Sequence, residues 1–190
     1  MITDDSPEDS VKELVKEYLP NDRIKYHRNE IRLGSPENWN ASVKMAQGEY
    51  IKILHHDDWF ASPNSLAKFV EMLDSNPNAD FAFSGAIAQP ATKRKAWHHF
   101  ASKFWLEELK KEPTRLFFQN IIGPPSSTII RKSAFVEYDK NLVWMVDIAQ
   151  YMQILCSHDF VATQEALIYS TTQAPHQLTS TCSKSKNINT

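Results

Sequence analysis

Two histidines and two aspartates follow directly after an apolar segment, residues 50–54. They are His55, His56, Asp57 and Asp58. Adjacent carboxylates repel each other, so a pair at the end of a buried strand costs stability unless a positive charge lies nearby. A divalent cation meets this need, because carboxylate oxygens suit Mg²⁺ or Mn²⁺ and the imidazoles favour Mn²⁺. Taken alone, the run is equally consistent with Asp58 capping a turn beside solvated histidines.

The elements that position this run are predicted by the spacing of apolar residues. A helix capped by Ser6 and a strand over residues 23–27 come first, followed by a helix that begins near residue 36 and ends at Gly48. Strands over residues 50–54 and 80–84 flank a helix that closes near residue 76. This alternation predicts βαβ units and a largely parallel sheet. Ligands bind beyond the C-terminal ends of such strands, where the Asp4-Asp5-Ser6 loop and the His55–Asp58 run then both lie.

The second half of the chain is less regular. We expect a helix over residues 96–110, strands over 116–122 and 128–131, a helix that opens around Asp147, and a strand over 166–170. The fold class is therefore α/β, with a mixed, mostly parallel sheet flanked by helices. Residues 1–180 are expected to form a single domain and residues 181–190 a disordered tail, because the tail lacks apolar side chains.

Composition excludes several classes of protein. The 190 residues carry 21 Lys and Arg against 23 Asp and Glu, a net charge of −2, which gives no electrostatic footprint for nucleic acid. Two distant cysteines indicate neither a disulfide scaffold nor a structural zinc site. Neither a transmembrane segment nor a signal peptide is evident, so we expect a cytoplasmic protein.

Several residues fall in register with a known pattern of Asn, Gly, Asn, A-x-G-x-Y-I and an acidic pair: Asn29, Gly34, Asn40, Ala46, Gly48, Tyr50, Ile51, Asp57 and Asp58. The Asp4-Asp5-Ser6 loop, with Asp9, is similar to a D-D-x-S-x-D loop. Together these motifs resemble the family 2 glycosyltransferases of the GT-A fold. The resemblance covers most of the chain and is strongest in the first 60 residues.

The resemblance implies a metal-dependent inverting glycosyltransferase. It would use Mn²⁺ or Mg²⁺ and move a sugar from a UDP- or GDP-sugar to a hydroxyl acceptor on a glycan, protein or lipid. Asp147 is the implied catalytic base, with Asp139 and Asp159 as alternatives. Asp57 and His176 are the implied metal ligands. The implied nucleotide-sugar contacts are Asp4, Asp5, Ser6, Asn40, His55 and His56.

The chain departs from the family pattern in two ways. His55 stands at the first position of the D-x-D metal motif, where an acid is common. The family also has a strand and a helix before the D-D-x-S loop, and this chain starts after them, so the nucleotide pocket is expected to lack one wall. Two other functions stay open. One is an inactive remnant that binds a nucleotide or a partner, and the other is a metal phosphohydrolase that uses His and Asp ligands.

Overall fold

The computed structural model describes residues 1–175 and residue 177. The predicted ligand His176 and the predicted tail lie outside the described residues. In chain order the elements are β1 (Ile2–Asp4), α1 (Ser10–Lys16), β2 (Tyr26–Arg28), α2 (Glu37–Met45), β3 (Tyr50–Ile51), β4 (Asp58–Phe60), α3 (Ser65–Asp74), β5 (Ala79–Pro90), β6 (Trp97–His99), α4 (Lys103–Lys111), η1 (Pro113–Phe117), η2 (Pro125–Ser127), β7 (Thr128–Arg131), η3 (Lys132–Ala134), α5 (Val146–Leu155) and β8 (Asp159–Thr172), where η marks a 3₁₀ helix.

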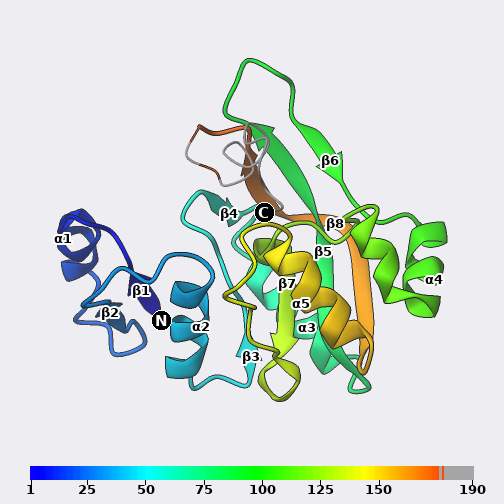
Figure 1. Cartoon of the computed structure of the whole chain (residues 1–190), viewed down its shortest axis with the longest axis horizontal. Helices are drawn as coiled ribbons and strands as arrows, with labels where there is room; N and C mark the ends of the chain where they lie inside the picture. Colours follow the sequence, from blue (N-terminus) through cyan, green and yellow to red (C-terminus); the bar gives the residue numbers. More distant parts are fainter. Residues whose placement is uncertain (176, 178–190) are drawn as a thin grey trace.

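The strands form two sheets. β1 and β2 make a parallel pair, and six strands make a larger sheet in the order β3-β7-β5-β8-β4, with β6 paired to β5. The two longest strands, β5 and β8, run parallel over most of their length, whereas β3, β4, β6 and β7 pair antiparallel with their neighbours. The smaller sheet lies at one end of the molecule, with α2 between it and the larger sheet (Figure 1). The predicted α/β class is confirmed.

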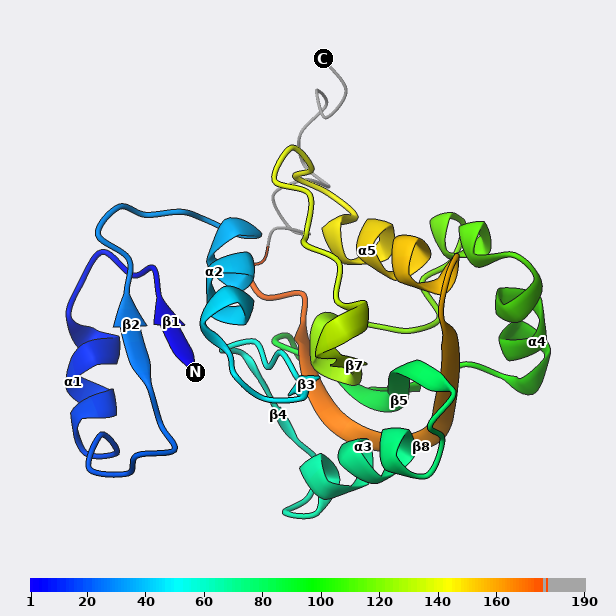
Figure 2. The same ribbon diagram turned by 90° about the horizontal axis from the view of Figure 1, so that it is seen from below.

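Helices cover both faces of the larger sheet because side chains of β5 alternate between them. Phe81 and Phe83 point into a cluster built with α4, η1 and α5, whereas Ala82 packs on the other face against Phe69 and Leu73 of α3. Figure 2 shows α3 and α5 on opposite sides of the sheet. Burying one such phenylalanine contributes about 1.5–3 kcal/mol to the stability of the fold. The two clusters therefore stabilise the sheet that carries the site.

The predicted strand over residues 116–122 was wrong. The chain there forms η1, which begins at Pro113, and then a loop. Leu116 and Ile122 are nevertheless fully buried in the cluster below α5. The apolar run therefore reflects burial, which a short sequence window does not distinguish from strand structure.

The predicted helix over residues 96–110 was correct only in its second part. Trp97–His99 form β6, which pairs with β5. The helix α4 begins at Lys103, where Ser102 Oγ accepts the backbone N–H of Trp105 at 3.4 Å. Ser102 therefore explains why the helix begins here, because its side-chain oxygen accepts an N–H of the first turn that has no partner within the helix.

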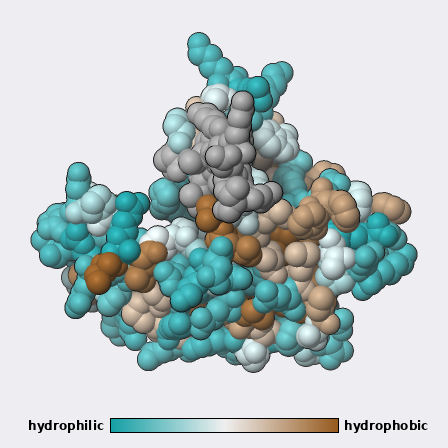
Figure 3. All heavy atoms as spheres, viewed as in Figure 1, coloured by the Kyte–Doolittle hydropathy of each residue, from teal (hydrophilic) through white to brown (hydrophobic). Residues whose placement is uncertain are grey.

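The face of the described residues that Figure 3 shows is largely hydrophilic. Hydrophilic residues cover most of the part that contains α1 and β2, at the left of Figure 3, and hydrophobic residues gather in small groups. Among residues 1–175 and 177, no helix combines the length and the apolar character that crossing a membrane requires.

Candidate active site

One cavity of about 1800 Å³ lies where β1, α2, the turn after β3 and the start of α5 meet. Among the described strands, β1 pairs only with β2, and β3 pairs only with β7. The other edges of β1 and β3 are unpaired there, and the cavity extends between them. Segments that are far apart in the sequence thus share one wall. The predicted site residues that line the cavity are Asp4, Asp5, Ser6, His55, His56, Asp57 and Asp147.

Asp4 ends β1 as a buried, ionised carboxylate. Its Oδ1 accepts the backbone N–H of Ser6 at 2.9 Å and also the Ser6 hydroxyl, and its Oδ2 accepts the Tyr26 hydroxyl at 2.6 Å. Burial would raise the pKa of Asp4, but the hydrogen bonds from Ser6 and Tyr26 together hold it below its ordinary value. Burial and the bond to Asp4 raise the pKa of Tyr26 to about 12.

Ser6 does not cap α1, which corrects the prediction from the sequence. Its hydroxyl donates to Asp4, and α1 begins four residues later, at Ser10. The position before Ser10 is Asp9, which makes no side-chain cap but pairs with Arg28. The loop is therefore shaped by Asp4 and not by the helix that follows it.

Asp5 fixes the loop that precedes α2. Its carboxylate accepts the backbone N–H groups of Leu33 at 2.8 Å and Gly34 at 2.7 Å, and the Asn29 amide at 3.1 Å. Gly34 has φ +73°, a left-handed conformation that glycine adopts without a steric penalty. Asn29, Gly34 and Asp5 are thus one structural unit that brings the first loop against α2.

The imidazole of His55 is held on the α2 side of the cavity. It stacks on Trp39, with ring centroids 4.8 Å apart and planes inclined by 26°. The backbone N–H of His55 donates to Ser126 Oγ at 3.0 Å. Burial lowers the pKa of His55 more than the nearby carboxylates of Asp57 and Asp58 raise it, so the ring is neutral at pH 7.

The two carboxylates after His55 take different positions. Asp58, the first residue of β4, is buried and accepts the backbone N–H of Thr171 at 3.0 Å. Asp57 Oδ2 accepts the side-chain amide of Gln177 at 3.0 Å. His55, Asp57 and Asp58 each offer one ligand atom, and these atoms lie within 4.8 Å of one another. Donors of one nitrogen and two oxygens at this spacing fit a divalent cation.

The resemblance implies Asp57 and His176 as metal ligands, whereas the structure adds Asp58 to the group that could hold an ion. The signal was present, because both aspartates follow the strand. What the sequence did not predict is that β3 ends at Ile51, three residues before the predicted strand end, so that the chain turns and starts β4 at Asp58. The turn brings Asp58 back towards His55, with 4.0 Å between His55 Nδ1 and Asp58 Oδ2.

Lys52 also lines the cavity, close enough to Asp58 to feel its charge. Its ammonium donates to the backbone carbonyls of Ser126 and Ile53, the latter at 3.2 Å, and lies 4.6 Å from the centroid of the Phe69 ring. Burial lowers the pKa of Lys52 to about 7, although the charge of Asp58 opposes this shift. No sequence pattern singles out this lysine, because it falls inside an apolar run.

Asp147 enters the cavity from the first turn of α5. The preceding Met145 has φ 61°, a left-handed conformation that bends the chain into the helix. Burial raises the pKa of Asp147, while backbone N–H donors at the helix start partly oppose the shift. Two buried tyrosines, Tyr138 and Tyr151, lie close enough for the Asp147 charge to raise their pKa values further.

The two alternative bases lie elsewhere. The Asp139 side chain accepts both the backbone N–H and the amide of Asn141, each at 2.9 Å, and Asp139 does not line the cavity. Asp159 is exposed at the start of β8 and borders a different cavity. Of the three candidate bases, Asp147 is the one placed with the His55–Asp58 turn.

Asn40 is buried outside the cavity lining. Its amide donates to the carbonyl of Tyr138 at 2.8 Å, and its oxygen accepts the Tyr138 N–H at 2.9 Å. Both of its polar atoms are thus used by a backbone segment 98 residues away. This placement gives Asn40 a structural contact in place of the predicted nucleotide contact.

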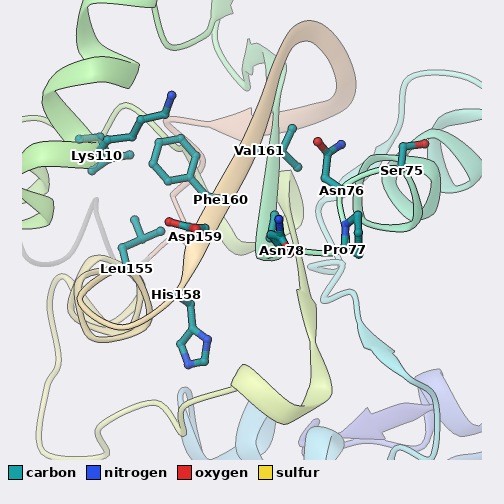
Figure 4. Close-up of a pocket in the computed structure, with 12 residues that line it drawn as sticks. Ser75, Asn76, Pro77, Asn78, Lys110, Leu155, His158, Asp159, Phe160 and Val161 are labelled. Carbon is teal, nitrogen blue, oxygen red and sulfur yellow. The ribbon is translucent and has the colours of Figure 1, made fainter.

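A second cavity, of about 550 Å³, lies at the opposite end of β5 and β8 (Figure 4). Its labelled polar side chains do not converge, since Lys110 and His158 point away from each other. The ring of His158 instead approaches Asp80, with 2.7 Å between Nδ1 and Oδ2. This cavity therefore brings together no set of groups for catalysis.

Comparison with curated proteins supports a glycosyltransferase. An uncharacterized glycosyltransferase of Methanocaldococcus jannaschii is 29% identical over 148 residues, which are 75% of this chain and 49% of that protein. An uncharacterized glycosyltransferase of Haemophilus influenzae is 24% identical over 110 residues, 58% of this chain and 36% of that protein. The chain thus spans about half the length, or less, of these relatives.

Solved structures share the fold. The structure of Staphylococcus aureus TarS 1-349 superposes with a TM-score of 0.66 at 16% identity and covers 89% of this chain and 50% of that chain. The same protein in complex with UDP gives a TM-score of 0.65 at 16% identity, over 91% of this chain and 50% of that chain. The predicted GT-A-like fold is confirmed. The family described as Glycosyl transferase family 2 matches residues 1–139, most of the chain, and the chain therefore belongs to glycosyl transferase family 2.

Proposed function

We propose that this chain forms the catalytic domain of a metal-dependent inverting glycosyltransferase with a nucleoside diphosphate sugar as donor and a hydroxyl group as acceptor. The observation that carries the proposal is a single cavity lined by the Asp4–Ser6 loop, the His55–Asp58 turn and Asp147. Uridine is the favoured base, because the structurally similar TarS has been solved with UDP. The acceptor is a hydroxyl of a glycan, protein or lipid.

The first loop would bind the base of the donor. A carboxylate offers about four acceptor positions. Asp4 accepts three hydrogen bonds from Ser6 and Tyr26, so it keeps one acceptor position for an N–H of the base. Because Asp4 is ionised and buried, such a bond is charge-assisted and stronger than a neutral one.

His55, Asp57 and Asp58 would hold a divalent cation, Mn²⁺ or Mg²⁺. Their ligand atoms lie within 4.8 Å of one another, and the neutral imidazole keeps a nitrogen lone pair. When bound, such an ion supplies positive charge that stabilises a diphosphate leaving group. The exposed His56 lines the same cavity and can approach the donor phosphates or ribose.

Asp147 would act as the general base. It takes the proton of the acceptor hydroxyl while that oxygen attacks the anomeric carbon. The bond from that carbon to the diphosphate oxygen breaks, the electron pair leaves with the nucleoside diphosphate, and the configuration inverts. The raised pKa of Asp147 suits this role, because a base works best with a pKa near the operating pH.

The release of UDP from UDP-sugars tests the proposal. Purified chain is incubated with UDP-glucose, UDP-N-acetylglucosamine or UDP-galactose and Mn²⁺, and free UDP is measured over time. We expect release with at least one donor, lost in Asp57→Ala and in Asp147→Asn and retained in the remote control Asp159→Asn. Release that survives Asp57→Ala contradicts the metal site, and UDP binding without any release identifies a non-enzymatic remnant.

A further inference from the structure

The short strand β6 contributes two ring side chains to the cavity of the candidate site. Trp97 and His99 lie two residues apart on this strand and both line the cavity, whereas His98 between them does not. We propose that Trp97 and His99 bind the acceptor, and that the acceptor is a saccharide whose ring stacks on Trp97 and whose hydroxyl group pairs with His99. The inference rests on the proposed function and names the class of its acceptor.

The register of the larger sheet places Trp97 in one row with Asp58. Asp58 pairs with Ser170 of β8, and Ser170 pairs with Ala88 of β5. Ala88 in turn pairs with Trp97. Side chains in such a row point to one face of the sheet, and adjacent strands lie about 4.8 Å apart, so the backbones of Asp58 and Trp97 are separated by at most about 14 Å. The two residues between them have short side chains, which leaves an open floor between the carboxylate and the indole.

His99 lies on the side of the cavity that carries Asp147. Tyr151, one helical turn after Asp147, donates its hydroxyl to the carbonyl of Gly123 at 3.3 Å. A Cβ atom added to Gly123 would lie 3.4 Å from Cδ2 and 3.6 Å from Nε2 of His99, so the imidazole packs directly against this glycine. Because the general base takes its proton from the acceptor, a group on the side of the base meets the acceptor.

The Nε2 atom of His99 is a hydrogen-bonding group that needs a partner. It is shielded from solvent and makes no hydrogen bond within residues 1–175 and 177. The backbone of Ile121 hydrogen-bonds the ring, and this bond uses the other nitrogen, Nδ1, since Nε2 has no partner there. Buried polar atoms are nearly always paired in native proteins. A sugar hydroxyl both donates and accepts, so it can pair with Nε2 in either tautomer of the ring.

Trp97 supplies an apolar surface beside this nitrogen. The residue is 46% exposed and its neighbours in the row are small, so the indole is accessible from the cavity. Indole has a large flat face whose burial against a ligand is favourable. A sugar ring presents C–H groups on its faces and hydroxyl groups around its edge, which matches an indole next to Nε2 of His99. A lipid chain would cover the indole but leave Nε2 without a partner.

Saturation-transfer NMR on the full chain, with UDP and Mn²⁺ present, tests the inference. The probes are the methyl glycosides of glucose, galactose and N-acetylglucosamine, with a serine-containing peptide as the non-sugar acceptor. We expect saturation transfer to the ring protons of at least one glycoside. Trp97→Ala and His99→Ala are each expected to weaken its binding by about tenfold, the upper range for one aromatic contact or one net hydrogen bond.

Two further variants make this result specific. Trp97→Phe is expected to retain most of the glycoside binding, because it keeps an aromatic face. The matched control His98→Ala changes the residue between the two, whose side chain points to the opposite face of β6, and is expected to bind like the natural chain. Binding of UDP by each variant shows that it is folded.

The outcomes separate this inference from the proposed function. Mn²⁺-dependent UDP binding without glycoside binding, binding of the peptide alone, or glycoside binding that is unchanged in Trp97→Ala and His99→Ala overturns the inference and leaves the donor site standing. Weaker binding of UDP-glucose in Trp97→Ala, with UDP binding unchanged, would place the donor sugar on β6 and also overturn it. If neither UDP nor any glycoside binds, the inference and the proposed function both fail.

Discussion

The amide of Asn40 makes two hydrogen bonds with the backbone of Tyr138, at 2.8 Å to its carbonyl oxygen and at 2.9 Å from its N–H. These bonds tie α2 to the segment that leads into α5. Since α2 carries Trp39 beside His55, and α5 carries Asp147, Asn40 connects the two halves of the candidate site. A residue outside the cavity lining thereby holds α2 against the segment that leads to Asp147.

Asn40→Ala leaves buried backbone groups of Tyr138 without partners. We expect the free energy of unfolding to fall by about 1–3 kcal/mol, the usual desolvation cost of an unpaired buried polar group. The affinity for UDP is expected to stay unchanged. Urea unfolding and calorimetry measure the two quantities, with exposed Asn141→Ala as the control. A large loss of UDP affinity in a fully folded variant would return Asn40 to the nucleotide site.

Trp39 packs between the rings of His55 and Tyr138. Its ring stacks on His55 at 4.8 Å and meets Tyr138 edge-on at 5.1 Å. We expect Trp39→Ala to weaken metal binding and Trp39→Phe to restore most of it, because phenylalanine keeps an aromatic face. A double-mutant cycle with His55→Ala is expected to give a coupling of about 0.5–1.5 kcal/mol, as for other aromatic pairs. Additive effects would show that the stack does not position the imidazole.

The raised pKa of Asp147 predicts the pH dependence of transfer. The base must be deprotonated to accept a proton, so kcat is expected to rise with pH through a value above that of an ordinary aspartate. Asp147→Asn is expected to remove this rise of kcat with pH and to lower kcat by at least about 10²-fold, with donor affinity retained. The measurement is the pH profile of UDP release. An acidic limb that persists in Asp147→Asn would assign the base elsewhere.

Lys52 predicts a pH-dependent stability difference. Burial lowers the pKa of Lys52 to about 7 in the folded chain, whereas a lysine in the unfolded chain has a pKa near 10.4. Between these two pH values, the unfolded chain therefore binds more protons at this side chain than the folded chain does. The stability of the natural chain therefore rises with pH in this window. We expect Lys52→Met to be more stable than the natural chain by the largest margin at pH 6, and by a smaller margin at pH 9.

Urea unfolding at the two pH values checks this difference. The control is Lys140→Met, at an exposed position. Its free energy of unfolding is expected to differ from that of the natural chain by the same amount at pH 6 and at pH 9. An equal margin for Lys52→Met at pH 6 and pH 9 would mean that the Lys52 amine is as well solvated as one at the surface.

The sequence predicted those parts of the fold that depend on local patterns. The helix with Phe69 and Leu73 and the loop with Asp4 and Asp5 appear where the apolar spacing and the acidic motifs placed them. These features are set within a few residues, by periodicity and by turn chemistry. Most of the residues that the resemblance implied also line one cavity, with Asn40 as the exception: Asp4, Asp5, Ser6, His55, His56, Asp57 and Asp147.

Features that depend on distant partners were not predicted. β6 exists because Trp97 and His99 pair with β5, and no local signal distinguishes that pairing from the start of a helix. The resemblance implies a nucleotide contact for Asn40, and no local pattern reveals its actual partner, Tyr138, which lies 98 residues away. The lowered pKa of Lys52 arises from tertiary burial, which no local pattern predicts. Long-range contacts therefore decide the details of the site.

Calorimetric titration of the chain with UDP, in the presence and absence of Mn²⁺, tests the central claim most directly. The account predicts Mn²⁺-dependent UDP binding, weakened by at least about tenfold in Asp57→Ala, as expected when a metal site is damaged. The exposed control Asp159→Ala is predicted to bind like the natural chain. UDP binding of equal strength with and without Mn²⁺, unchanged in Asp57→Ala, would contradict the account.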